Sequence, residues 1–138
     1  MKLQFIKLHD EVELPVYSHT NDAGADIKMY KDVVIKHGEN KIPLGFSCII
    51  PPGCAAFLTM RSSWMSKGII ANFVPIDPDY KGEWHLLIYN IGDEFTIKKG
   101  ERISQVVILS GVQQCEFVET IDYVNNQRHS NGIGSTGN

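Results

Sequence analysis

The sequence predicts an all-β fold, either a sandwich or a barrel, on three observations. Glycines recur through the middle of the chain and divide it into short segments. These segments are rich in β-branched and aromatic residues, with turn residues about every 8–15 positions. No long stretch has the hydrophobic period of an amphipathic helix. Many short strands joined by regularly spaced turns are typical of sandwiches and barrels.

Seven segments have the composition expected of strands. The alternation is clearest in EFTIKK, where Phe95 and Ile97 would point to one face and Thr96 and Lys98 to the other. The seven segments are 32–37, 46–52, 55–60, 84–90, 94–99, 103–110 and 115–121.

One short helix is expected in SSWMSKG, residues 62–68. Ser62 or Ser63 would cap its start, and Gly68 would end it.

Composition limits the class of protein. A chain of 138 residues suits one domain with a single core. A net charge of -3 without a basic run argues against a general nucleic-acid or membrane-surface binder. The charged start is unlike a signal peptide, and no apolar run approaches about 18 residues. Cys48 and Cys54, which lie among apolar residues, are expected to be buried, reduced thiols, and we expect an intracellular protein.

The segment IDPDYKGE, residues 76–83, has two interpretations. Two carboxylates around a proline, followed by Tyr and Gly, are typical of a solvated hairpin turn. Alternatively, Asp77 is a general base at the end of an apolar run, and Tyr80 is a flat platform for a sugar or a base.

Other segments also have more than one interpretation when taken singly. In RSSWMSKG, Arg61 with the two serines is either an anion site at a helix start or an N-cap beside a surface arginine. Asp26 in DAGADIKMY is either a turn former or a metal-site residue. GERISQVVI could be a hairpin turn that leads into a core strand, with Gln105 facing solvent.

The tail RHSNGIGSTGN, residues 128–138, has little apolar surface. Ordering a backbone residue costs about 1–2 kcal/mol, so the tail cannot stabilise a fold of its own. It is either loose chain or a segment that becomes ordered around a ligand.

These motifs, in this order, resemble those of the homotrimeric dUTP pyrophosphatase (dUTPase) family. The five matching segments are DAGADI (22–27), RSS (61–63), IDPDYKGE (76–83), GERISQ (100–105) and RHSNGIGSTG (128–137). The resemblance implies a distorted jelly-roll β-barrel, or β-clip, over residues 1–124, with a mobile C-terminal arm over 125–138. It also implies a homotrimer in which each active site is shared between subunits.

The resemblance implies hydrolysis of dUTP to dUMP and pyrophosphate, which keeps uracil out of DNA and supplies dUMP for thymidylate synthesis. Asp77 would order the attacking water as general base, and Tyr80 would stack on the deoxyribose. Asp26 would hold Mg²⁺ through water. No membrane or direct nucleic-acid partner is implied, and the location would be the cytoplasm, or the host cytoplasm for a phage or viral protein. The implied substrate-binding residues are Arg61, Ser62, Ser63, Asn72, Tyr80, Gln105, Arg128, Ile133, Gly134, Ser135 and Thr136.

Among the positions that depart from the family pattern, Ile133 and Pro75 bear most directly on recognition of the base. Ile133 stands where the family has a phenylalanine over the uracil ring, so apolar contact would replace stacking that contributes about 1–3 kcal/mol. Pro75 lies in the hairpin that should read uracil and has no N–H to donate. Asn72 is a candidate side-chain reader of the base.

Two alternatives remain beside this reading. A dCTP deaminase has a similar fold but carries a glutamate where this chain has Leu87. A phage or viral dUTPase relative could also have a regulatory, protein-binding role.

Overall fold

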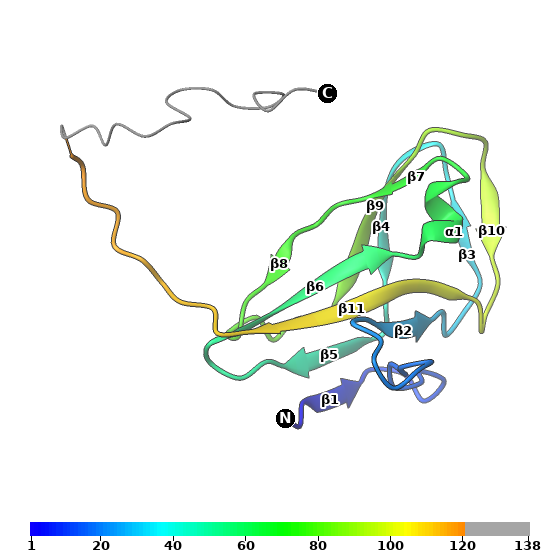
Figure 1. Ribbon diagram of the computed structural model, residues 1–138. Coiled ribbons are helices and arrows are strands. Elements are labelled where there is room, and N and C mark those ends of the chain that lie inside the picture. Colours follow the sequence, from blue (N-terminus) through cyan, green and yellow to red (C-terminus); the bar gives the residue numbers. More distant parts are fainter. Residues whose placement is uncertain (121–138) are drawn as a thin grey trace.

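The structure is a computed structural model that describes residues 1–120, which form eleven strands and one short helix (Figure 1). The predicted all-β class is confirmed. The strands are β1 (Gln4–Lys7), β2 (Ala25–Lys28), β3 (Val33–Ile35), β4 (Gly38–Pro43), β5 (Phe46–Ile49), β6 (Cys54–Met60), β7 (Ile69–Ala71), β8 (Pro75–Ile76), β9 (His85–Asn90), β10 (Phe95–Ile97) and β11 (Arg102–Ser110); the helix is α1 (Ser62–Met65).

The strands form four antiparallel sheets within the described residues. The largest sheet has the order β2-β11-β6-β8, and β11 pairs along most of its length with β6. A second sheet has the order β4-β9-β7, and two pairs, β1-β5 and β10-β3, complete the body. The sheets surround one hydrophobic core, as expected of a distorted barrel.

Strand β9 shows how the sequence pattern produces this core. Leu86 and Ile88 are buried, whereas the alternate residues Leu87 and Tyr89 are more exposed. The same period of two occurs in β10, where Ile97 is fully buried and Thr96 is exposed, as predicted. The chain therefore has a core-facing and an outward-facing set of side chains, and the outward set supplies the pockets described below.

Most of the predicted strand segments contain a strand, but one prediction was wrong for the residues that the structure describes. Residues 115–120 form no strand, although their composition favours one. A strand needs a neighbour that accepts and donates its backbone hydrogen bonds, and this segment runs away from the body (Figure 1). The expected end of this strand, residue 121, lies outside the described residues.

The helix is shorter than expected and has a different cap. Helix α1 covers Ser62–Met65, and its N-cap is Arg61, which makes no side-chain cap hydrogen bond. The prediction that Ser62 or Ser63 caps the helix was wrong, because both serines already lie in its first turn. Gly68 follows with a φ of 82°, a conformation that suits glycine after a helix.

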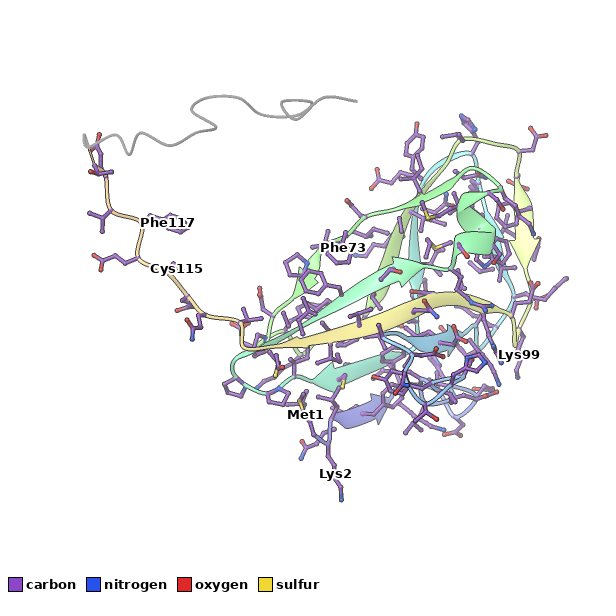
Figure 2. The ribbon with its side chains drawn as sticks, in the orientation of Figure 1. Met1, Lys2, Phe73, Lys99, Cys115 and Phe117 are labelled. Carbon is purple, nitrogen blue, oxygen red and sulfur yellow. The ribbon has the colours of Figure 1, made fainter. Side chains whose placement is uncertain are left out.

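Two groups of apolar side chains remain uncovered. The Phe57 ring of β6 stacks on the Phe73 ring at 4.4 Å, and Phe73 is 63% exposed. Beyond β11, Phe117 is 98% exposed on the segment that Figure 2 shows extending from the body with Cys115. Large apolar side chains left in water in this way are typical of interaction surfaces.

Cys48 and Cys54 are buried, free thiols, as predicted. Burial raises the pKa of the Cys48 thiol. Among residues 1–120, no helix has the length and apolar character needed to span a bilayer.

We expect Gly45→Ala to destabilise the fold far more than Gly53→Ala. Both glycines have positive φ, 75° and 76°, where a side chain costs about 1–2 kcal/mol. At Gly45 an added Cβ would also lie 2.7 Å from Val12 and 2.8 Å from Tyr30, whereas at Gly53 it would meet nothing within 4 Å. Urea denaturation should give a loss of about 3 kcal/mol or more for Gly45→Ala and about 1 kcal/mol for Gly53→Ala. Equal losses would contradict the packing argument.

Candidate active site

A buried carboxylate occupies the centre of the first polar cluster. Asp26 on β2 is only 6% exposed. Its Oδ2 accepts hydrogen bonds from Ser18 Oγ at 3.0 Å and Arg102 Nη1 at 3.1 Å. Its Oδ1 accepts from Gln105 Nε2 at 3.0 Å and lies 3.3 Å from Arg61 Nε. A carboxylate has about four lone-pair directions, so the four donors satisfy Asp26 fully.

The strand register brings these donors together. Gln105 of β11 lies opposite Asp26, and a bulge interrupts the pairing between Arg102 and Ser104. Because successive strand residues point to opposite faces, this extra residue turns Arg102 onto the same face as Gln105. Without the bulge, Arg102 would point to the opposite face of the sheet.

Helix α1 holds the arginines close together. The indole Nε1 of Trp64 donates to the backbone carbonyl of Arg102 at 3.0 Å. The Trp64 ring also stacks on Phe95 at 5.5 Å. This packing fixes the start of the helix beside β11, so that Arg61, at the end of β6, reaches Asp26.

The network keeps Asp26 ionised. Burial alone would raise its pKa, because a charged group loses hydration. The hydrogen bonds from Gln105 and Ser18 and the charges of Arg61 and Arg102 oppose this effect, and together they lower the pKa of Asp26 below its usual value. The cluster therefore contains one fixed negative charge and two guanidinium groups at the edge of an open pocket.

A second pocket, of about 280 Å³, lies between the hairpin after β8 and the sheet of β4 and β9. Asp77 and Tyr80 contribute from the hairpin, and Asn72 contributes from the segment after β7. The backbone N–H of Tyr80 donates to the carbonyl of Asp77 at 3.1 Å and closes the turn. Much of the apolar lining of this pocket comes from Leu58, Ile76 and Leu87.

Gly82 permits the position of Tyr80. The Tyr80 hydroxyl donates to the carbonyl of Glu83 at 2.9 Å, which folds the ring back over the turn. A Cβ at Gly82 would lie 2.6 Å from that hydroxyl, so any larger residue would displace the ring. Glu83 in turn accepts the N–H of Gly45 at 2.9 Å and ties the hairpin to the body.

The second pocket differs from the first cluster in the state of its polar groups. Asp77, Asn72 and Lys41 are exposed residues at the rim of the pocket, and within residues 1–120 their side chains have no hydrogen-bond or ion-pair partner. The indole N–H of Trp84, a lining residue that is 2% exposed, has no partner in this part of the chain either. Unpaired polar groups in a mostly apolar pocket are typical of a ligand site.

The two sites are well separated in a single chain. Asp26 pairs with Gln105 and Gln105 with Thr59, whereas Ile76, which precedes Asp77, pairs with Ala56. Three strand spacings of about 4.8 Å separate β2 from β8, and three residues of about 3.3 Å separate Thr59 from Ala56. Asp26 and Asp77 are therefore on the order of 15 Å apart or more.

The predicted site residues thus form two groups. Asp26, Arg61 and Gln105 line one pocket, and Gln105 is engaged with Asp26 instead of pointing freely into solvent. Asp77, Tyr80 and Asn72 line the other. Ser62 and Ser63 are exposed in the first turn of α1. The predicted residues Arg128, Ile133, Gly134, Ser135 and Thr136 lie outside the described residues.

Sequence reasoning missed several residues of these pockets. Ser18 and Arg102 were not predicted, although Arg102 lies within the quoted GERISQ segment. Lys41 and His85 also line the second pocket. The only signal for them was their alternation with the buried residues of β4 and β9.

Known proteins similar to this chain share its architecture over nearly its whole length. A family model described as dUTPase matches residues 10–137. The deoxyuridine 5′-triphosphate nucleotidohydrolase of Nautilia profundicola is 40% identical and covers 99% of both chains. That of Zymomonas mobilis is 38% identical over 99% of this chain and 98% of its own. The solved dUTPase of Staphylococcus bacteriophage 80alpha with the dUTP analogue dUpNHpp is 26% identical, has a TM-score of 0.88, and covers 99% of this chain and 98% of its own.

We expect Asp26→Asn to change the acid stability of the protein. The unfolded carboxylate takes up its proton near pH 4, above the lowered pKa of the folded state. Asp26 therefore stabilises the fold above about pH 4, and this stabilisation is lost as the pH falls through the folded pKa. At pH 7 the variant should lose about 1–3 kcal/mol, because the negative charge that the two arginines contact is removed and one acceptor oxygen is replaced by an NH₂ donor.

The measurement is urea denaturation between pH 7 and pH 2.5. Asp26→Asn should show a shallower loss of stability below pH 4 than the wild type. Asp79→Asn, at an exposed carboxylate, is the control and should retain the wild-type profile. An unchanged profile in Asp26→Asn would exclude this residue as a source of acid sensitivity.

Proposed function

The chain belongs to the dUTPase family, and on that premise we propose that it hydrolyses dUTP to dUMP and pyrophosphate in a Mg²⁺-dependent reaction. The observation that carries the proposal is the unpaired carboxylate of Asp77 in an apolar pocket beside Tyr80. A carboxylate without a partner is free to take a proton from water. The family assignment indicates the substrate, and the geometry supports the role that we propose for each group.

The nucleoside would occupy the second pocket. Tyr80, with its ring held over Gly82, would pack against the deoxyribose and leave no space for a 2′-hydroxyl. Asn72 and the apolar lining would hold the base. Asp77 would orient a water for in-line attack on the α-phosphorus, and pyrophosphate would leave from the opposite side.

The first cluster would bind the phosphates. Arg61 with Ser62 and Ser63 supplies donors at the end of β6, and Gln105 supplies an amide from β11. Positive and neutral donors placed where phosphate charge develops lower the barrier to its departure. We assign the γ-phosphate to the arm of residues 125–138, through Arg128, Ser135, Thr136 and the nearby backbone, with Ile133 and Gly134 over the nucleoside.

Asp26 is the residue that would hold Mg²⁺ through water. Residues 1–120 contain no group of three or more potential metal ligands, which suits an ion that binds mainly substrate phosphates and water. All four acceptor positions of Asp26 are taken, and its contact with Arg61 is the longest at 3.3 Å. The fit therefore requires Arg61 to turn to phosphate and release one acceptor. Bound Mg²⁺ neutralises charge on the phosphate oxygens.

A homotrimer with shared sites would solve the separation of the two clusters. The base must lie within about 3 Å of the water that it activates, yet Asp77 is on the order of 15 Å or more from the phosphate-binding groups of its own chain. A second subunit would bring its first cluster to this pocket, and a third would donate the arm. The exposed Phe57–Phe73 stack and Phe117 supply apolar surface for such contacts.

We expect Asp77→Asn to reduce kcat for dUTP by about 10²–10⁴-fold with Mg²⁺ present, because an amide cannot accept the proton. Phosphate-release kinetics with added pyrophosphatase give the measurement. Asp79→Asn changes the neighbouring exposed carboxylate, which does not line the pocket, and should keep activity within about twofold of the wild type. A wild type that does not hydrolyse dUTP would refute the proposed function itself.

Shared sites predict complementation between inactive variants. Asp77→Asn removes the base that one subunit would supply to a site. Arg61→Ala removes a phosphate-binding group that another subunit would supply to the same site. After joint refolding in equal amounts, about one quarter of the sites in a random trimer should combine an intact Asp77 with an intact Arg61. Activity should therefore return in the mixture but not in either variant alone. Light scattering should report a particle of three chains. If a refolded trimer of the mixture regains no activity, each chain holds a complete site.

A further inference from the structure

The second pocket contains a lysine that the proposed chemistry does not use. Lys41 on β4 lies opposite Leu87 of β9, and the backbone N–H of Asn72 donates to the carbonyl of Leu87 at 2.9 Å. Asn72, Leu87 and Lys41 therefore form one row across the wall of the pocket, and all three line it. The row faces the hairpin that carries Asp77.

Lys41 is an exposed lining residue of the second pocket, and its ammonium group is free to meet a ligand. No carboxylate among residues 1–120 lies within ion-pair distance of its ammonium group, and the group donates no hydrogen bond there. Most of the surrounding wall is apolar. Lys28 and Lys98, by contrast, pair with Glu13 and Asp32. A cation at the edge of an apolar pocket is a donor available to a ligand.

The hairpin opposite Lys41 has one backbone N–H donor fewer than it would have with a residue other than proline at position 75. Pro75 lines the pocket and has no N–H. Uracil presents a ring N–H between two carbonyl oxygens, whereas cytosine replaces one carbonyl with an amino donor. An ammonium group has donors and no acceptor, so it matches a carbonyl and leaves an amino group unsatisfied.

We propose that Lys41 is a specificity-determining residue, which donates to the carbonyl oxygen at C4 of the uracil ring and so discriminates against cytosine, whose amino group takes the place of that oxygen. The carboxamide of Asn72, on the other side of Leu87 in the row, can accept the ring N–H, so the two side chains would approach the edge of the base from two sides. This inference rests on the proposed function, because it requires the base to lie in the second pocket. It adds to that function a side chain that reads the base.

The test compares the binding of two nucleoside monophosphates to the full chain. Isothermal calorimetry gives Kd for dUMP and dCMP with the wild type and with Lys41→Met, which keeps the apolar stem but removes the charge. Loss of a charged hydrogen bond should weaken dUMP binding by about 10- to 100-fold, and dCMP binding should change by less than about threefold. Lys41→Arg, which keeps a cationic donor, should retain most of the preference for dUMP.

Lys2→Met is the matched control, because Figure 2 shows Lys2 on the exposed N-terminal segment, pointing away from the body. Its affinities should equal those of the wild type. Thermal unfolding of each variant checks that it is folded. Because Lys41 is exposed, its substitution should leave the unfolding temperature unchanged.

The outcomes separate this inference from the proposed function. An unchanged ratio of the two dissociation constants in Lys41→Met would overturn the role of Lys41, even with dUTP hydrolysis intact. An equal loss for dUMP and dCMP would also overturn it, because a lysine that binds phosphate would affect both nucleotides alike. A wild type that hydrolyses no dUTP but binds dUMP in preference to dCMP through Lys41 would refute only the reaction.

Discussion

A buried charge has to be matched by donors, and this requirement organises one end of the large sheet. Asp26 lies in a strand with buried neighbours on both sides, where an unpaired carboxylate would be strongly destabilising. Its four donors come from the loop before β2, from the end of β6 and from two positions of β11. Satisfying one carboxylate therefore fixes the relative positions of segments that are far apart in the sequence.

The second pocket follows the opposite rule. Its carboxylate, its carboxamide and its ammonium group have no partner within residues 1–120, and its hairpin is joined to β6 by only two residue pairs. Unpaired groups lose little protein bonding when a ligand arrives, whereas a group of the saturated cluster has to give up a contact with Asp26 first. The two sites therefore differ in how much protein bonding a ligand would have to replace.

The sequence was most informative where side chains decide the structure. β-rich composition between turn residues located β6, β9, β10 and β11, and in these strands one face is more buried than the other. Strands β1, β4 and β8 have polar residues, a proline or very short lengths, and their partners hold them in place. Residues 115–120 illustrate the converse, because β-rich composition forms no strand without a neighbouring edge.

The residues of the candidate site were predictable where a local motif identified them, and not where only the fold brings them together. Motif residues such as Asp26, Asp77 and Tyr80 could be named from local chemistry and from the resemblance. The contact between Asp26 and Arg102 could not be predicted, because it depends on the bulge, and no single residue type indicates a bulge. Lys41 was missed because its role depends on the strand that lies opposite it.

The bulge between Arg102 and Ser104 also decides which side chains the start of β11 gives to the core and which it gives to the polar cluster. If the strand paired regularly with all of its residues, Ile103 would lie opposite Lys28, and every residue on the N-terminal side would change face. Arg102 would then point away from Asp26. The extra residue lets Ile103 stay fully buried in the core while Arg102 reaches the carboxylate from the same strand.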